Sequence, residues 1–341
     1  MSSKMRAILI KGGVGTADDL YIGEYDKPVP TKGEVLVKIK AVGVNRMDLI
    51  QRVGDYPLPP QANKDILGVE FSGIVEGLGE GVSAFKNGDE VFGLAYGGAY
   101  AEYITVQSSM LMHKPASLTF VQAAGVPESW FTAFQALVLV GGLTAGKSVL
   151  IHAGSSGVGI AANQIARFLG AKYVFTTAGD DKNLEFLLSM NEGATHGINY
   201  KKQDFAEVIE KVTKGEGVDV IVDFVGKNYF ARNIKILKLD GRLVQLAMLS
   251  GGTVSEVDLQ PILYRRLRIE GTTLRSRSLE YQSNLASRFE KELLPYLKGE
   301  EHKDARLHAY IYSTYPWTKA ADAQKEMEAN RNRGKMVLLV E

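Results

Sequence analysis

Short apolar runs separated by glycine and proline fill the first third of the chain. They lie at residues 34–41, 67–76, 89–94 and 100–106. Runs of this length between turn-forming residues predict the strands of an irregular, mostly β domain. After Thr119 the pattern changes, and apolar side chains recur at helical spacing from Val121 to Leu137. We therefore expect a helical run between this β domain and the next part of the chain.

From residue 148 onward, the chain alternates strands and helices. Predicted strands at 149–151, 173–176, 219–224 and 241–246 are interleaved with helices at 158–169 and 184–190. Such alternation favours a parallel, doubly wound sheet with helices packed on it. After residue 271 the chain becomes charged and helical, and a last apolar strand is predicted at 335–340.

The turn after the first of these strands carries the most chemical information. It places Gly154, Gly157 and Gly159 between that strand and a helix of small residues. Without side chains, the backbone can approach a pyrophosphate, whose charge is stabilised at a helix N-terminus. Ser156 either contacts the cofactor or caps the helix that starts near Val158, and both roles are compatible. A tight loop in any α/β protein is the alternative, but the flanking strand and helix favour a nucleotide site.

The choice of cofactor depends on the turn after the second strand. An NAD enzyme places an acid there to bind the ribose hydroxyls, and Thr177 stands where we expect that acid. Lys182 adds positive charge suited to a 2′-phosphate, which favours NADPH. Asp180 and Asp181 argue against this choice because either can be the ribose acid, and the lysines nearby are also explained as a solvated face. The contacts expected in the two turns and just beyond them are Gly154, Ser156, Gly157, Val158, Thr177, Gly179, Lys182 and Tyr200.

Composition narrows the chemistry further. The 341 residues include no cysteine, which excludes disulfides, thiolate nucleophiles and cysteine-ligated zinc or iron–sulfur centres. Five scattered histidines give no metal-ligand spacing. The net charge of +1 provides no field for nucleic acid or an anionic membrane, and no apolar run is long enough to cross a bilayer. Any redox chemistry must come from a bound cofactor, and we expect a cytoplasmic protein that binds neither nucleic acid nor membrane.

Several short motifs resemble one branch of a known superfamily. They are Asn45-Arg46-Met47-Asp48, Gly54-Asp55-Tyr56-Pro57, Leu67-Gly68-Val69-Glu70, Gly157-Val158-Gly159 and Ile198-Asn199-Tyr200. Together they resemble the zinc-free, zeta-crystallin-like quinone oxidoreductases of the medium-chain dehydrogenase/reductase superfamily. Residues 127–135 and 327–330 are similar to the tumour-suppressor-inducible type within that branch.

The resemblance implies an α/β protein of two domains. A split, β-rich, GroES-like catalytic domain would consist of residues 1–123 and a return segment at 274–341. A doubly wound Rossmann domain would occupy residues 124–273. The resemblance also implies a nicotinamide cofactor bound between the domains, and a homodimer or homotetramer.

The same resemblance implies that the protein is metal-free. Zinc-dependent relatives carry a ligand cysteine where Asn45 stands and a ligand histidine where Val69 stands. Neither side chain can replace a thiolate or an imidazole on zinc.

Roles for individual residues follow from the resemblance and from the strand ends. Asn45 and Tyr56 would flank the nicotinamide, and the Tyr56 phenol can donate to a quinone oxygen as charge develops there. The structural alternatives are a turn or cap residue for Asn45 and a loop-packing ring for Tyr56. The expected catalytic residues are Tyr56, Asn45 and Ser156. Further cofactor contacts are expected from Thr132, Leu274 and Asn330 by resemblance, and from Phe224, Leu246, Ala247 and Met248 at strand ends.

We expect two-electron reduction of a small quinone-like acceptor by NADPH. A quinone accepts hydride without a Lewis acid, so a metal-free site is compatible with this reaction, and the cofactor carries the difficult chemistry. A zinc-free enoyl or enone reductase on the same fold is one alternative. A nucleotide-binding structural or regulatory protein with little turnover is another. Nucleic-acid binding ranks below both because the composition shows no basic patch.

Overall fold

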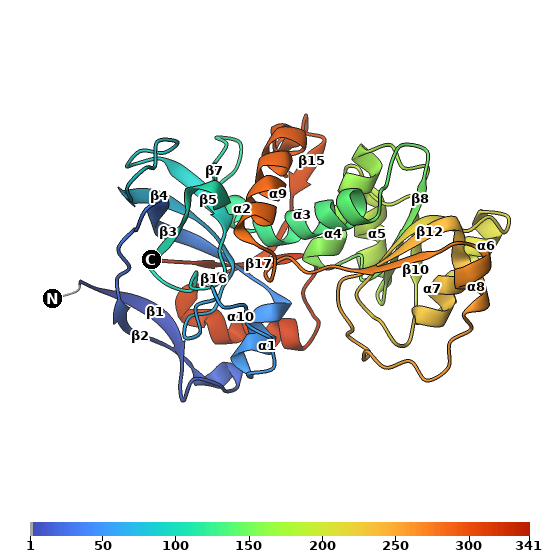
Figure 1. Ribbon diagram of the computed structural model, residues 1–341, viewed down its shortest axis with the longest axis horizontal. Helices are drawn as coiled ribbons and strands as arrows, with labels where there is room; N and C mark the ends of the chain where they lie inside the picture. The colour runs from blue at the N-terminus through green and yellow to red at the C-terminus, as the bar shows by residue number, and fades with distance from the viewer. Residues whose placement is uncertain (1–2) are drawn as a thin grey trace. The chain divides into compact units, whose positions relative to one another are not determined.

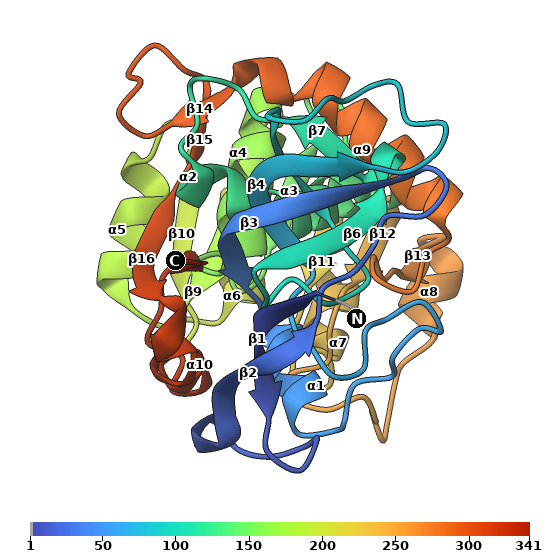
Figure 2. The same ribbon diagram turned by 90° about the vertical axis from the view of Figure 1, so that its left-hand side faces the viewer.

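A computed structural model describes residues 3–341, and it divides the chain into two units. Unit 1 runs to Phe131 and resumes from Leu274 to Glu341, whereas unit 2 is Thr132–Thr273. The elements of both are drawn in Figure 1 and, turned, in Figure 2. The rings of Trp130 and Phe131 contact the ring of Phe289 within unit 1. Because of these aromatic contacts, unit 1 extends to Phe131, beyond the boundary at residue 123 that the family resemblance implies.

The strands of unit 1 come from both ends of the described chain. They are β1 Lys4–Ile10, β2 Leu20–Asp26, β3 Glu34–Val44, β4 Glu70–Leu78, β5 Glu90–Leu94, β6 Tyr103–Gln107, β7 Leu111–His113, β14 Leu297–Gly299, β15 Leu307–Ala309, β16 Ile311–Pro316 and β17 Lys335–Leu339. The main sheet has the order β16-β17-β3-β4-β5-β7, with β6 paired to β3. Its pairings are antiparallel except for the parallel pair of β16 and β17.

The helices of unit 1 are α1 Arg46–Arg52, α2 Phe120–Ala124, α9 Leu279–Glu292 and α10 Ala320–Glu328, and α3 Pro127–Phe134 crosses into unit 2. Thr119 caps α2 by accepting a hydrogen bond from the backbone of Gln122. The predicted helical run is interrupted at Pro127, which lacks an N–H and therefore starts a new helix. It ends in a π-helical turn at Gln135–Val140.

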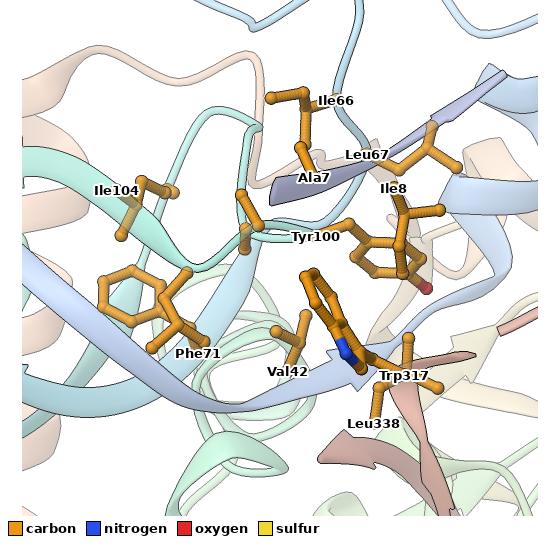
Figure 3. Packing of buried hydrophobic residues seen from close by; sticks show 14 of the residues in the cluster. Ala7, Ile8, Val42, Ile66, Leu67, Phe71, Tyr100, Ile104, Trp317 and Leu338 are labelled. Atoms are coloured by element: carbon orange, nitrogen blue, oxygen red, sulfur yellow. The ribbon is translucent and has the colours of Figure 1, made fainter. Parts of the chain in front are cut away.

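The core of unit 1 is apolar and joins the early strands to the last ones. Figure 3 shows Ile8 and Phe71 packed in one cluster with Trp317 and Leu338. All four side chains are buried, and burial of a side chain of this size stabilises a fold by about 1.5–3 kcal/mol. β17 pairs with β3 and shares this core, so the last strand of the chain belongs to the same unit as the early strands.

Unit 2 is a six-stranded parallel sheet covered by helices. Its strands are β8 Ser148–Ile151, β9 Tyr173–Ala178, β10 His196–Asn199, β11 Val218–Asp223, β12 Leu237–Gln245 and β13 Arg268–Gly271. Its helices are α4 Gly157–Phe168, α5 Asp181–Ser189, α6 Phe205–Val212, α7 Phe230–Ile236 and α8 Gln260–Tyr264. The order β10-β9-β8-β11-β12-β13 is the 3-2-1-4-5-6 order of a Rossmann sheet. The predicted doubly wound fold is confirmed.

This topology determines where a ligand binds in unit 2. The sheet grows from β8 toward β9 in one direction and from β8 toward β11 in the other. Open α/β sheets bind ligands at the carboxyl ends of the strands where the direction of growth reverses. The residues that follow β8, β9 and β11 are therefore the candidates for a ligand site in unit 2.

No helix within residues 3–341 is both long and apolar enough to span a bilayer.

Candidate functional site

The turn between β8 and α4 accepts only glycine at two positions. Ala153 has a φ of +48°, a left-handed conformation that is uncommon outside glycine. A Cβ atom on Gly154 would overlap the hydroxyl of Thr176. A Cβ atom on Gly159 would lie against the carbonyl oxygens of Ala153 and Gly154. The tight packing of this turn is the kind that lets a backbone approach a pyrophosphate.

Ser156 is the N-cap of α4, and its Oγ accepts a hydrogen bond from the backbone N–H of Gly159 at 3.0 Å. The predicted cap role is confirmed. The helix that follows has twelve residues, and its N-terminal dipole favours an anion. The turn and the helix end therefore fit the pyrophosphate of a dinucleotide. Direct contacts from Ser156, Gly157 and Val158 stay predictions.

The two acids after β9 are both engaged within the protein. Asp180 Oδ1 accepts hydrogen bonds from two backbone amides in the first turn of α5, at 2.8 and 3.3 Å. The Asp181 carboxylate accepts from Asn199 Nδ2 at 2.6 Å and from Lys202 Nζ at 2.5 Å. Asp180 is thus a helix cap, and Asp181 joins α5 to the end of β10. Both oxygens of Asp181 and one oxygen of Asp180 are therefore engaged within the protein.

Lys182 and Tyr200 lie at the same turn with unused polar groups. Lys182 is exposed and forms no ion pair within residues 3–341. A Cβ atom on Gly179 would lie 2.5 Å from the Tyr200 hydroxyl, which shows that the phenol covers this turn. Lys201 also reaches Gly179, with its Cε 3.1 Å from the same Cβ position. The turn presents a ring and two ammonium-bearing chains, a donor set that fits a phosphate.

His152, the residue after β8, joins three strand ends through hydrogen bonds. Its Nδ1 lies 3.1 Å from Thr177 Oγ1 and its Nε2 lies 2.8 Å from Asn233 Oδ1. Asn233 Nδ2 in turn donates to Asp223 Oδ2 at 3.2 Å. All four residues are completely buried. Asn233 donates through its Nδ2 group to Asp223, so its Oδ1 can only accept from His152 Nε2. His152 therefore carries its proton on Nε2, and its Nδ1 accepts a hydrogen bond from the Thr177 hydroxyl.

The His152 imidazole is neutral in this position. Burial lowers its pKa to about 4, although the hydrogen bond with Asn233 opposes the shift. Asp223 also closes the loop after β11, accepting from the backbone N–H groups of Val225 at 2.6 Å and Gly226 at 3.1 Å. Thr177 was predicted to contact the ribose. Its hydroxyl is buried and committed to His152, so the direct contact stays a prediction that the structure does not favour.

In unit 1, Asn45 lies beside a buried ion pair of Lys335 and Glu70. The two charged side chains are 5% and 0% exposed. Lys335 Nζ donates to Asn45 Oδ1 at 2.6 Å, and Asn45 Nδ2 donates to Glu70 Oε1 at 2.8 Å. The second Glu70 oxygen accepts from the backbone of Glu128 at 2.8 Å. Both ends of the Asn45 amide are occupied, so its nicotinamide contact stays a prediction.

Asn45 also begins helix α1, where its backbone N–H donates to Asp48 Oδ2 at 2.8 Å. The Tyr100 hydroxyl donates to the same oxygen at 3.2 Å. Asp48 is completely buried, and burial raises its pKa to about 6. The same face of unit 1 therefore holds a second buried acid next to the Lys335–Glu70 pair.

Tyr56 lies under the guanidinium of Arg275, whose Cζ is 5.3 Å from the ring centroid. The Tyr56 hydroxyl has no hydrogen-bond partner in the part of the chain that the structure describes. Burial and the charge of Glu128 raise the pKa of Tyr56, whereas Arg275 lowers it. Burial and the charge of Glu70 raise the pKa of Glu128 to about 8, so its carboxyl is mostly neutral at pH 7.

The remaining predicted contacts are divided between the units. In unit 2, Thr132 buries a hydroxyl without a partner among the described residues, and Phe224 and Leu246 directly follow β11 and β12. Ala247 and the exposed Met248 come next. In unit 1, Leu274 is buried and Asn330 Oδ1 accepts from Arg46 at 2.7 Å. Their contacts with a cofactor stay predictions.

Several residues of these clusters were not predicted from the sequence, namely His152, Asn233, Asp223, Asp48, Glu70, Glu128, Arg275 and Lys335. A usable signal was present for some of them. His152 follows an apolar strand, Asp223 ends one, and Lys335 begins one. A polar residue at such a place is buried and needs a partner. Among residues 3–341, no three His, Asp or Glu side chains gather in a way that would hold a metal ion.

Comparison with known proteins shows the family. Residues 31–116 match the alcohol dehydrogenase GroES-like domain, and residues 157–291 match the zinc-binding dehydrogenase family. The chain is 31% identical over 318 residues to human quinone oxidoreductase, covering 92% of this chain and 91% of that protein. The chain belongs to the quinone oxidoreductase family of the medium-chain dehydrogenase/reductase superfamily, as its motifs predict.

Two solved structures are similar over nearly the whole chain. One is CurK enoyl reductase, with a TM-score of 0.83, 28% identity and coverage of 99% of each chain. The other is an NAD-dependent alcohol dehydrogenase, with a TM-score of 0.83, 30% identity and coverage of 99% of this chain and 100% of that one. The protein is an oxidoreductase with a GroES-like and a Rossmann-like domain. Its family implies a nicotinamide dinucleotide cofactor and a small-molecule substrate.

Proposed function

We propose that this protein reduces small quinones with NADPH, by hydride transfer and without a metal ion. The observation that carries the proposal is the Tyr56 phenol, which has no partner among the described residues and lies under the buried Arg275 guanidinium. A phenol in this state can donate a hydrogen bond to an oxygen that gains negative charge, as a quinone oxygen does on reduction. The likeness to human quinone oxidoreductase supports the acceptor class.

The preference for NADPH is proposed from the turn after β9. Asp181 is paired with Lys202, and one oxygen of Asp180 caps α5, so neither acid is in the usual position of a free ribose-binding carboxylate. Lys182 has no ion-pair partner in the described part of the chain, and Tyr200 covers Gly179. These residues would hold the phosphate, and the glycine turn with Ser156 would hold the pyrophosphate. The bound cofactor supplies the hydride, while the protein orients it and excludes water.

A metal-free site is proposed from the cluster around Asn45. In zinc-dependent relatives a cation is held at this position by a thiolate and an imidazole, as noted for Asn45 and Val69 above. Here the ammonium of Lys335 lies against both Asn45 Oδ1 and Glu70. The buried negative charge of Glu70 is therefore neutralised by a side chain, and an amide is a poor replacement for a zinc ligand.

A second candidate function is the reduction of an activated C=C bond. The likeness to CurK enoyl reductase over 99% of this chain favours it. The same phenol would then stabilise an enolate oxygen instead of a hydroquinone oxygen.

The cytoplasmic location and the homodimeric or homotetrameric assembly are proposed from the family resemblance.

The test is a panel of acceptors assayed with NADPH and then with NADH, after exhaustive chelation. We expect benzoquinones and naphthoquinones to be reduced with NADPH, at full rate and without stoichiometric zinc in elemental analysis. A preference for enones with little quinone turnover would assign the protein to the second function. Tight NADPH binding without turnover of any acceptor would indicate a regulatory or structural protein. One zinc ion per chain that is needed for turnover would contradict the metal-free proposal.

A further inference from the structure

Arg275 is a buried charge that two neighbours hold in place. Its Nε donates to the backbone carbonyl of Tyr96 at 2.8 Å, and its Nη1 donates to Gln51 Oε1 at 2.8 Å. Only 2% of the residue is exposed, and its Nη2 has no partner among the described residues. Burial lowers the pKa of Arg275, but a guanidinium stays protonated at neutral pH. A fixed positive charge is thus present inside unit 1.

The loop at Gly97 is built around this guanidinium. Gly97 has a φ of +151°, and a Cβ atom there would lie 2.9 Å from Arg275 Nη2 and 3.0 Å from the backbone nitrogen of Asn63. Any other residue at this position would push the guanidinium or the loop away. Side chain and backbone therefore both restrict Arg275 to one position.

The Arg275 guanidinium also lies over the ring of Tyr56, with its Cζ 5.3 Å from the ring centroid. A cation over an aromatic face is attracted by the ring, and the attraction increases when the site is dry. The pKa of Tyr56 is raised, first by burial and then by Glu128 and Asp48, and the nearby Arg275 charge opposes this shift by stabilising negative charge on the phenol oxygen. With Arg275 beside it, this unpaired hydroxyl is a stronger hydrogen-bond donor than it would be at the same buried place without the cation.

We propose that Arg275 is a positioning residue that acts through Tyr56. It holds the ring in one orientation and stabilises the charge that the phenol oxygen takes on as it donates to the reduced acceptor. The inference rests on the proposed quinone reduction with Tyr56 as donor. It adds a residue that the sequence motifs of the family did not point to, because Leu274 was the contact expected from this segment.

The test is a double-mutant cycle of Arg275→Met and Tyr56→Phe, followed by kcat with a quinone and NADPH. If Arg275 acts through the phenol, Arg275→Met lowers kcat about tenfold in the native background and less than about twofold in the Tyr56→Phe background. Arg275→Lys keeps the charge and recovers part of the loss. Arg277, which lies over the Tyr281 ring at 4.6 Å, is the matched control, and Arg277→Met leaves kcat near the native value.

A second readout does not depend on turnover. The pKa of Tyr56 is measured in the cofactor-free protein by carbon NMR of ring-labelled tyrosine, with the signal assigned by its loss in Tyr56→Phe. We expect Arg275→Met to raise this pKa and Arg277→Met to leave it unchanged. If Arg275→Met does not fold, Gln51→Leu removes one anchor without removing the charge, and should shift both readouts less and in the same direction.

The outcomes separate the two proposals. Equal loss of kcat from Arg275→Met in both backgrounds, with an unchanged Tyr56 pKa, means that Arg275 only supports the fold. If Arg275→Met raises the Tyr56 pKa but Tyr56→Phe has a native kcat, Arg275 acts electrostatically on Tyr56, but the phenol is not the donor. That second result overturns the proposed function of Tyr56 and the catalytic part of this inference.

Discussion

Both units bury a polar cluster at the place where the sequence predicts a site, but the clusters differ in charge. The one in unit 1 contains Glu70, Lys335 and Arg275 as buried charges. The one in unit 2 is centred on the neutral His152, and its buried acid, Asp223, accepts hydrogen bonds from N–H groups of Asn233, Val225 and Gly226. The unit 2 network is satisfied by hydrogen bonds, whereas the unit 1 cluster also pairs opposite buried charges. Under the proposed function, unit 2 would bind the cofactor and unit 1 would stabilise charge during the reaction.

The largest effect is expected from breaking the charged cluster. Lys335→Met leaves Glu70 as an uncompensated buried charge, which should lower the free energy of unfolding by about 3–5 kcal/mol. The control is Lys202→Met in unit 2, because Lys202 and its partner Asp181 have side chains that are 65% and 55% exposed. An exposed pair contributes at most about 1 kcal/mol.

Chemical denaturation of both variants checks this prediction. Adding Glu70→Gln to Lys335→Met should restore most of the lost stability, because the unpaired charge is then gone. Similar losses from Lys335→Met and Lys202→Met would show that the buried pair is not electrostatically special.

The two clusters should also respond to pH in opposite directions. The folded-state pKa of His152 is about 4, below the usual 6.5, so the unfolded chain binds the proton first as pH falls. Its contribution to stability is lost between pH 6.5 and 4. The folded-state pKa of Asp48 is about 6, above the usual 3.8, so its contribution is lost as pH rises from 3.8 to 6. Each shift corresponds to about 3 kcal/mol.

Stability profiles of His152→Asn and Asp48→Asn relative to the native protein measure these contributions. Relative to the native protein, the free energy of unfolding of His152→Asn should increase as pH falls below 6.5. That of Asp48→Asn should increase relative to the native protein as pH rises above 3.8. Each variant serves as the control for the other. Profiles with the same sign would contradict the lowered pKa of His152 or the raised pKa of Asp48.

What the sequence could predict was local. The strand, glycine turn and helix around Gly154 are contiguous, and the Ser156 cap depends on residues three positions apart. The pairing of Glu70 with Lys335 joins strands from opposite ends of the chain, and no local pattern indicates it. Thr177 was interpreted from its place at a strand end, but its hydroxyl turns inward because His152 offers a buried acceptor. Partners of buried polar groups are decided by the fold, which spacing alone does not describe.

In unit 2, the choice of cofactor provides the next prediction. Lys182→Ala should remove a charge-assisted contact to the 2′-phosphate worth about 1.5–3 kcal/mol. That corresponds to about 10- to 100-fold weaker NADPH binding, with NADH binding nearly unchanged. Dissociation constants for both cofactors, from quenching of protein fluorescence, measure the effect. Equal weakening of both would show that Lys182 acts on the pyrophosphate or on folding.

Lys202→Ala is the matched control for this measurement, because Lys202 belongs to the same face but is paired with Asp181. It should change the ratio of NADPH to NADH affinity far less than Lys182→Ala does. A larger change from Lys202 would move the phosphate contact to that residue.

The central claim is that the Tyr56 phenol stabilises the acceptor during reduction, and the rate of single-turnover quinone reduction by Tyr56→Phe tests it most directly. Quinones are readily reduced, so we expect a rate about tenfold lower, with the NADPH dissociation constant unchanged. Tyr56→Ala should in addition raise KM, because it removes the ring as well as the hydroxyl. A native rate in Tyr56→Phe, with weaker binding only in Tyr56→Ala, would show that Tyr56 is a wall of the pocket and not a donor.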